Sequence, residues 1–119
     1  MHLQQYPNIV FNNVIKVNVT TLDKYVSENK IDQSNYNMIN IDVQGYELEV
    51  FKGSKQFLNN VDYIITEINR AEVYEDCALA RDLDDFLESY GFKRQETTWD
   101  GWTWGDAFYI KEKNDQKEN

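Results

Sequence analysis

The chain has 119 residues, with 21 acidic and 12 basic side chains and a formal net charge of -9 at pH 7, and 41% of its residues are hydrophobic. This is the length of one globular domain with a single core, and it leaves no room for a second domain. The excess of acids argues against sequence-independent binding to nucleic acid or to an anionic membrane surface, because both need clustered Lys and Arg. We therefore expect neutral or cationic partners.

The scarce residue types exclude further classes of protein. Cys77 is the single cysteine and His2 the single histidine. One cysteine rules out an internal disulfide and a Cys-based zinc site, and one histidine near the start argues against Ser-His-Asp or Cys-His catalysis and against His-ligated metals. The sequence has no run of about 18 apolar residues and no signal-peptide pattern at its start, so we expect a cytoplasmic protein.

The first half of the chain reads as alternating strands and helices. Residues 9–19 predict a strand, because apolar and polar residues alternate at its end. Residues 20–23 have the form of a capping box, which begins a short helix. Residues 38–43 form a compact apolar run of strand length, and a helical pattern continues from 45 to 60.

The second half predicts strand, helix and hairpin. Residues 61–68 are a second apolar run, and residues 75–88 predict a helix whose acidic side faces water and whose end is marked by Gly91. Residues 92–98 and 106–110 predict two strands joined at Asp100-Gly101, a dipeptide typical of hairpin turns. No apolar residue occurs from 111 onward, so we expect one domain over residues 1–110 and a disordered polar tail over 111–119.

This order of elements predicts an α/β fold with parallel strands joined by right-handed crossovers and an antiparallel last strand. In such sheets ligands bind outside the carboxyl ends of the strands. Asp42 ends one predicted strand and Glu67 ends the next, so the two acids would come close if these strands are neighbours about 4.8 Å apart.

Two interpretations of this acid pair remain open. In the functional one, Asp42 and Glu67 bind a cation, an amine or ligand hydroxyls, or one of them is a general base whose pKa is raised by burial or by its neighbour. In the structural one, Asp42 accepts N–H groups of the helix that begins near Tyr46, and Glu67 pairs with a basic side chain.

All three tryptophans lie around the predicted hairpin turn. Trp99, Trp102 and Trp104 could stack on a sugar, a base or a partner protein, or they could close one end of the core. The sequence does not decide between these two interpretations.

Three segments together resemble a known family. Residues 20–25 read T-T-L-D-K-Y, residues 39–53 read I-N-I-D-V-Q-G-Y-E-L-E-V-F-K-G, and residues 64–69 read I-I-T-E-I-N. They resemble the FkbM-type S-adenosylmethionine-dependent methyltransferases, in which a T-T-L-D helix start is followed by a strand ending in K-I-D-V-E-G-x-E-x-x-V-L-x-G and by a strand ending in an acid. Gly91-Phe92 and G-D-A-F-Y at 105–109 are similar to that family's closing strands, so the resemblance covers residues 14 to 110.

The resemblance implies a partial class I methyltransferase (Rossmann-like) sheet with parallel strands and an antiparallel terminal hairpin strand. It also implies an enzyme that moves a methyl group from S-adenosylmethionine to a hydroxyl, often of a sugar or natural product. It makes Asp42 and Glu67 the catalytic candidates, places Asp42 and Gln44 beside the cofactor, and places Glu67, Asn69 and Trp104 beside a small-molecule or glycan acceptor. Gln44 stands where the family usually has an acid.

One part of the family's pattern is absent from this sequence. Methyltransferases of this fold hold the methionine end of the cofactor with a Gly-rich loop after the first strand, and here no glycine precedes Gly45. We therefore expect a truncated or split enzyme that is inactive alone and is completed by an N-terminal half, or that forms a homo-oligomer.

Two alternatives to a methyltransferase stay open. One is a non-catalytic binding module that pairs with other polypeptides through an exposed sheet edge. The other is a hydrolase that uses Mg²⁺ or Ca²⁺ at Asp42 and Glu67, since carboxylates without histidine suit these cations.

Overall fold

A four-stranded mixed sheet is the centre of the fold. The computed structural model describes residues 15–70, 79–101 and 103–112. Strands β1 (Met38–Ile41), β2 (Tyr63–Asn69), β3 (Phe92–Asp100) and β4 (Trp104–Lys111) lie in the order β1-β2-β4-β3. β1 and β2 are parallel, and β4 is antiparallel to both of its neighbours. The predicted α/β class, with parallel strands followed by an antiparallel terminal hairpin, is confirmed.

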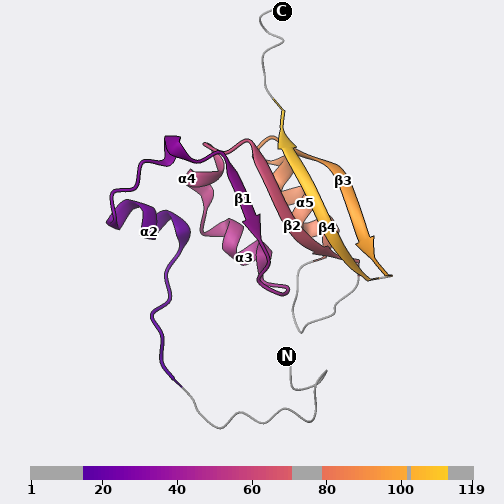
Figure 1. The fold of residues 1–119 in the computed structure, drawn as a ribbon, viewed down its shortest axis with the longest axis horizontal. Helices are drawn as coiled ribbons and strands as arrows, with labels where there is room; N and C mark the ends of the chain where they lie inside the picture. Colours follow the sequence, from indigo (N-terminus) through magenta and orange to yellow (C-terminus); the bar gives the residue numbers. More distant parts are fainter. Residues whose placement is uncertain (1–14, 71–78, 102, 113–119) are drawn as a thin grey trace, which may run out of the picture.

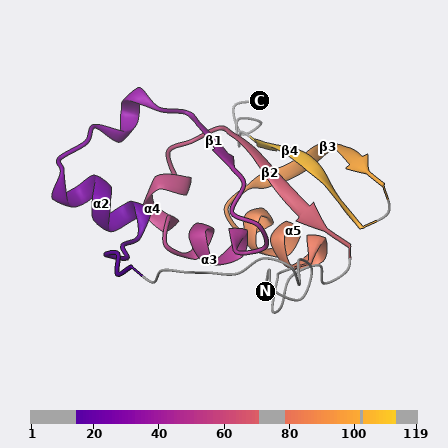
Figure 2. The same cartoon turned by 60° about the horizontal axis from the view of Figure 1, so that its bottom comes forward.

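The helices cover one face of this sheet. They are α2 (Leu22–Glu28), α3 (Glu47–Lys52), α4 (Lys55–Leu58) and α5 (Ala80–Glu88), and a single 3-10 turn, Gln33–Asn35, precedes β1. Figure 1 shows the sheet with α3 and α5 behind it, and Figure 2 shows all four helices in a row on the same side. Among the described residues no helix lies over the opposite face.

The core lies between the helices and the covered face of the sheet. Its fully buried apolar side chains come from α3, α4, α5 and all the strands except β1, and the largest of them are Tyr109, Phe51, Phe92, Leu58, Ile64, Ile68, Leu83 and Leu87. Burying a side chain of this size stabilises the fold by about 1.5–3 kcal/mol relative to leaving it exposed. The apolar residues of α5 recur every three or four positions and therefore lie on one side of the helix. This side packs on the sheet, as the sequence predicts.

The helix predicted over residues 45–60 is wrong as a single element, because it breaks between α3 and α4. The break falls at Gly53 and Ser54. A Cβ on Gly53 would lie 2.9 Å from Cβ of Thr21, and the Gly53 carbonyl accepts the N–H of Asp23 at 3.0 Å. Glycine at position 53 thus allows the start of α2 to approach the chain closely.

The capping box predicted at residues 20–23 is correct only in part. Thr21 is the N-cap of α2, and its hydroxyl accepts the Lys24 N–H at 3.1 Å. Asp23 does not return a bond to the cap. Its carboxylate instead accepts the N–H groups of Gln56 and Phe57 at 2.8 and 3.0 Å, so it caps α4 from 33 residues away.

The strand predicted over residues 9–19 is wrong in its described part, residues 15–19, which form no strand. Ile15, Val17 and Val19 are 79%, 72% and 90% exposed. Alternation of β-branched residues makes a strand only where a neighbouring strand supplies hydrogen bonds, and no described strand lies beside this segment. Residues 9–14 lie outside the described part of the chain.

The hairpin predicted near the end is confirmed. Gly91 and Gly101 have φ values of 90° and 82°, so glycine is needed both after α5 and at the turn between β3 and β4. β4 ends at Lys111, one residue beyond the predicted strand. The predicted helix over 75–88 is described only from Leu79, so Cys77 lies outside the described residues, as do positions 113–119 of the tail.

Candidate active site

The strand register brings the predicted acid pair together. Ile41, the last residue of β1, lies opposite Thr66 of β2, so the following residues Asp42 and Glu67 stand level at the carboxyl edge of the sheet. Asp42, Glu67 and a third acid, Glu47, each have a carboxylate oxygen within 4.8 Å of the others. The juxtaposition expected from the sequence is therefore present, and it includes one residue that sequence reasoning missed.

Glu47, the first residue of α3, is the missed residue. Its side chain is 1% exposed, and its two carboxylate oxygens accept the backbone N–H groups of Val43 and Gly45, both at 3.0 Å. The structural interpretation expected Asp42 to accept N–H groups of the helix near Tyr46, whereas the bonds seen here run from the turn before α3 to Glu47. The available signal was an acid in the first turn of the helix that follows the strand, where negative charge is favourable.

Glu67 has a strongly perturbed carboxyl group. Partial burial, a hydrogen bond with Asp42 and the negative charges of Glu47, Asp42 and Asp106 raise its pKa from 4.5 to about 7. Asp106 lies directly opposite Glu67 on β4. The neighbours that shift this pKa are all acids, so the alternative in which Glu67 pairs with a basic side chain does not describe this site.

This arrangement gives Glu67 a defined chemical capacity. Two carboxyl groups can hydrogen-bond to each other only when one of them carries a proton, so Asp42 and Glu67 form a pair that retains a proton at mildly acidic pH. A carboxyl group whose pKa lies near 7 can take up a proton at neutral pH and act as a general base.

The other predicted site residues lie around the acid pair. Gln44 is exposed and has a φ of 56°, two residues beyond Asp42. Asn69 ends β2 and lies opposite Trp104 of β4. The Asn69 side chain is 1% exposed, and neither its amide nitrogen nor its amide oxygen has a hydrogen-bond partner in the described part of the molecule.

Two of the three tryptophans lie in different surroundings. Trp99 packs partly buried against the core, and the guanidinium of Arg70 lies 3.7 Å from the centre of its ring. Trp104 is half-buried at the start of β4, and Trp102 lies outside the described residues. Trp99 thus fits the interpretation in which the aromatic cluster closes one end of the core.

The three acids are also the kind of oxygen ligand that Mg²⁺ or Ca²⁺ prefers. The carboxylate of Glu47 already accepts two backbone N–H groups. Asp42 and Glu67 have carboxylate oxygens within 4.8 Å of each other, and Asp42 contributes to the raised pKa of Glu67.

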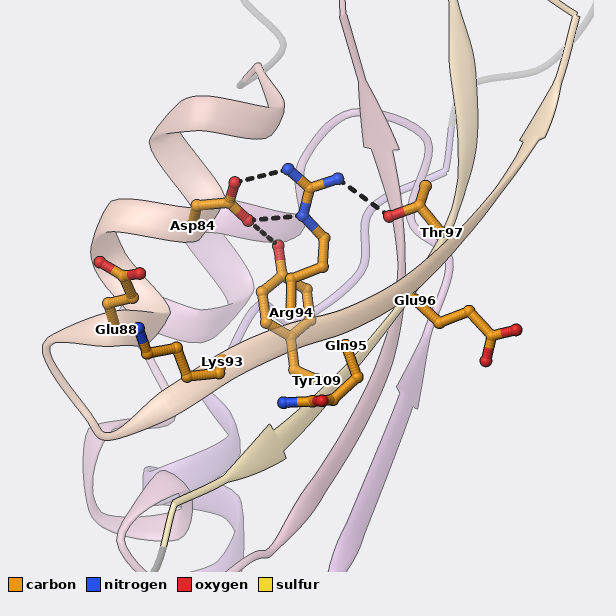
Figure 3. Close-up of a pocket in the computed structure, with 8 residues that line it drawn as sticks. All are labelled: Asp84, Glu88, Lys93, Arg94, Gln95, Glu96, Thr97 and Tyr109. Carbon is orange, nitrogen blue, oxygen red and sulfur yellow. Dashed lines mark hydrogen bonds and ion pairs between the residues drawn. The ribbon is translucent and has the colours of Figure 1, made fainter.

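A separate cavity of about 320 Å³ lies beside α5 and β3 (Figure 3). There the carboxylate of Asp84 accepts the Tyr109 hydroxyl at 2.6 Å and two guanidinium N–H groups of Arg94 at 2.7 and 3.0 Å, while Arg94 also donates to Thr97. Burial and the neighbouring Asp84 raise the pKa of Tyr109. These groups satisfy one another and tie α5 to the sheet, so the acid cluster is the better candidate for chemistry.

Comparisons with known proteins identify the family of the chain. The family model for the methyltransferase FkbM domain matches residues 2–94. The 2-O-methyltransferase NoeI of Sinorhizobium fredii is 34% identical over 89 residues, which are 75% of this chain and 36% of that relative. No solved structure matches, and no helix in the described residues is long and apolar enough to cross a membrane. With its parallel β1-β2 unit ending in the acid pair, the chain belongs to the FkbM methyltransferase domain family.

Proposed function

We propose that this chain supplies the acceptor side of an S-adenosylmethionine-dependent O-methyltransferase. The observation that supports this most is the Asp42–Glu67 pair at the carboxyl edge of the sheet, where Glu67 has a pKa of about 7. The family and the match to a 2-O-methyltransferase favour a hydroxyl acceptor, and we propose a sugar or natural-product hydroxyl.

In this proposal Glu67 is the general base. S-adenosylmethionine, when bound, supplies an electrophilic methyl group. Glu67 would take the proton of the acceptor hydroxyl as its oxygen bonds to the methyl carbon and the methyl–sulfur bond breaks, which leaves S-adenosylhomocysteine. Asp42 would hold the Glu67 carboxyl in place and contact the acceptor or the cofactor. A base with a pKa close to the working pH combines the right protonation state with useful proton affinity.

The remaining predicted residues keep supporting roles. Gln44 is exposed on the turn after β1, where it would contact the cofactor. Asn69 and Trp104 are cross-strand neighbours at the end of β2, and the unpartnered amide of Asn69 suits an acceptor hydroxyl.

The cofactor side of the site does not fit this chain alone, because no glycine precedes Gly45 to form a Gly-rich loop. The chain spans about a third of the length of the curated relative that it matches. We therefore propose that the cofactor loop of the active enzyme is supplied by a region outside these 119 residues.

A second candidate function is a non-catalytic assembly module. It is favoured by the outer edge of β1, which pairs with no strand but β2 in the described part of the chain, and by the exposed apolar side chains of residues 15–19. Sedimentation of the chain distinguishes this assembly module from a split enzyme. A dimer supports pairing between copies, and a monomer that binds an N-terminal fragment of NoeI supports a split enzyme.

A chimera tests the proposed function. The segment of NoeI that matches this chain is replaced by the corresponding 89 residues of this chain, and transfer of labelled methyl from S-adenosylmethionine to the NoeI acceptor is measured. Glu67→Gln should lower kcat at pH 7 by about 10²–10⁴-fold, as expected for loss of a general base. The control Glu49→Gln, an exposed acid of α3, should stay within about twofold. Equal activity of the Glu67→Gln chimera and the parent would refute the role of Glu67.

A further inference from the structure

Glu47 carries a buried carboxylate that has no direct part in the proposed reaction. The residue lies at the start of α3 and is 1% exposed, although it is an acid. Burying a carboxylate is costly unless hydrogen bonds or opposite charges compensate. The contacts of Glu47 therefore indicate what its charge does.

These contacts clamp the turn that follows β1. Oε2 of Glu47 accepts the Val43 N–H and Oε1 accepts the Gly45 N–H, each at 3.0 Å. The two bonds flank Gln44, whose φ of 56° lies in the left-handed region that a residue with a Cβ seldom adopts. A backbone in this region persists only when its surroundings hold it there. The carboxylate of Glu47 does so by hydrogen bonds to the residues before and after Gln44.

The clamped turn directly follows Asp42. Asp42 directly precedes Val43, and its carboxylate lies within 4.8 Å of those of Glu67 and Glu47. The charged groups that act on Glu67 are Asp42 after β1, Glu47 on α3 and Asp106 on β4. Glu47 alone among them is buried and is also bonded to the backbone beside Asp42.

We propose that Glu47 is the positioning residue of this site: its carboxylate holds the 43–45 turn so that Asp42 lies beside Glu67. Its role in catalysis rests on the proposed methyltransferase function, whereas the clamp itself does not. A glutamate is specific for this task, because two N–H donors need two acceptor oxygens and a glutamine side chain has only one.

NMR of the complete chain, in buffer with a chelator, tests the clamp without cofactor or acceptor. In the wild type the amide protons of Val43 and Gly45 should exchange at least about tenfold more slowly than that of the exposed Gln44. In Glu47→Gln at least one of the two should lose this protection. The ¹³C carboxyl signal of Glu67 should then titrate at a lower pH, because a nearby like charge is gone. The control Glu49→Gln, on the exposed side of the same helix, should change neither signal.

Two results would overturn the proposal. One is a Glu47→Gln variant that retains both protected amides and the wild-type titration of Glu67. The other is rapid exchange of both amides in the wild type, which decides the matter even if the variant does not fold. Full activity of the Glu67→Gln chimera, which would refute the proposed function, would leave these signals of the chain unchanged, so failure of the clamp and failure of the proposed function are distinguishable.

Discussion

The raised pKa of Glu67 predicts that Glu67→Gln changes how stability depends on pH. The folded protein raises this pKa from 4.5 to about 7, so it binds the proton more tightly than the unfolded chain does. The stability contributed by Glu67 is therefore complete below about pH 4.5 and is lost as the pH rises through about 7. A shift of this size corresponds to at most about 3 kcal/mol. The side chain is only partly buried, so solvent screening should reduce the effect to about 1 kcal/mol.

Denaturant unfolding of the wild type and of Glu67→Gln at pH 5, 6, 7 and 8 measures this effect. The difference in unfolding free energy, wild type minus variant, should fall by about 1 kcal/mol from pH 5 to pH 8. The titration of other acids cancels in this difference. Glu96→Gln, which replaces an exposed acid of β3, should give a difference that does not vary with pH. A constant difference for Glu67→Gln would refute the proton-retaining pair.

Three further substitutions test the fold around the site. Asp23→Asn leaves one of two N–H groups at the start of α4 without its acceptor, and urea unfolding should show a loss of about 1–2 kcal/mol. Gly105→Ala would place a Cβ 2.5 Å from a backbone oxygen of β3 and 2.8 Å from Cα of Trp99, so its unfolding free energy should fall by about 1–3 kcal/mol or more. Tyr109→Phe removes a donor to Asp84 while the ring stays buried, and thermal unfolding should show a cost of about 1 kcal/mol.

The sequence predicted the elements whose pattern is local. The apolar runs of β1 and β2, the three-four spacing of α5 and the glycine of the Asp100-Gly101 turn each determine their own segment. Because β1 and β2 are parallel neighbours, the acids at their ends could also be placed side by side without a structure. This is why Asp42 and Glu67 were predictable as a pair.

What the sequence did not predict depends on contacts between distant residues. Asp23 caps a helix 33 residues away, and Gly53 ends α3 where Thr21 packs against it, so local patterns misread both positions. The alternation in residues 15–19 says nothing about whether a partner strand exists. Glu47 was missed because it and Asp42 are both acids beside the same turn, and only the geometry shows which of them binds the N–H groups.

Titration calorimetry of the 119-residue chain with S-adenosylmethionine tests most directly whether this chain holds the acceptor side of the site without the cofactor side. We predict no binding in the micromolar range by the chain alone, because its sequence has no glycine before Gly45 to form the cofactor loop. A micromolar dissociation constant would contradict this division of the site and would show that the acid edge and the turn after β1 suffice to bind the cofactor.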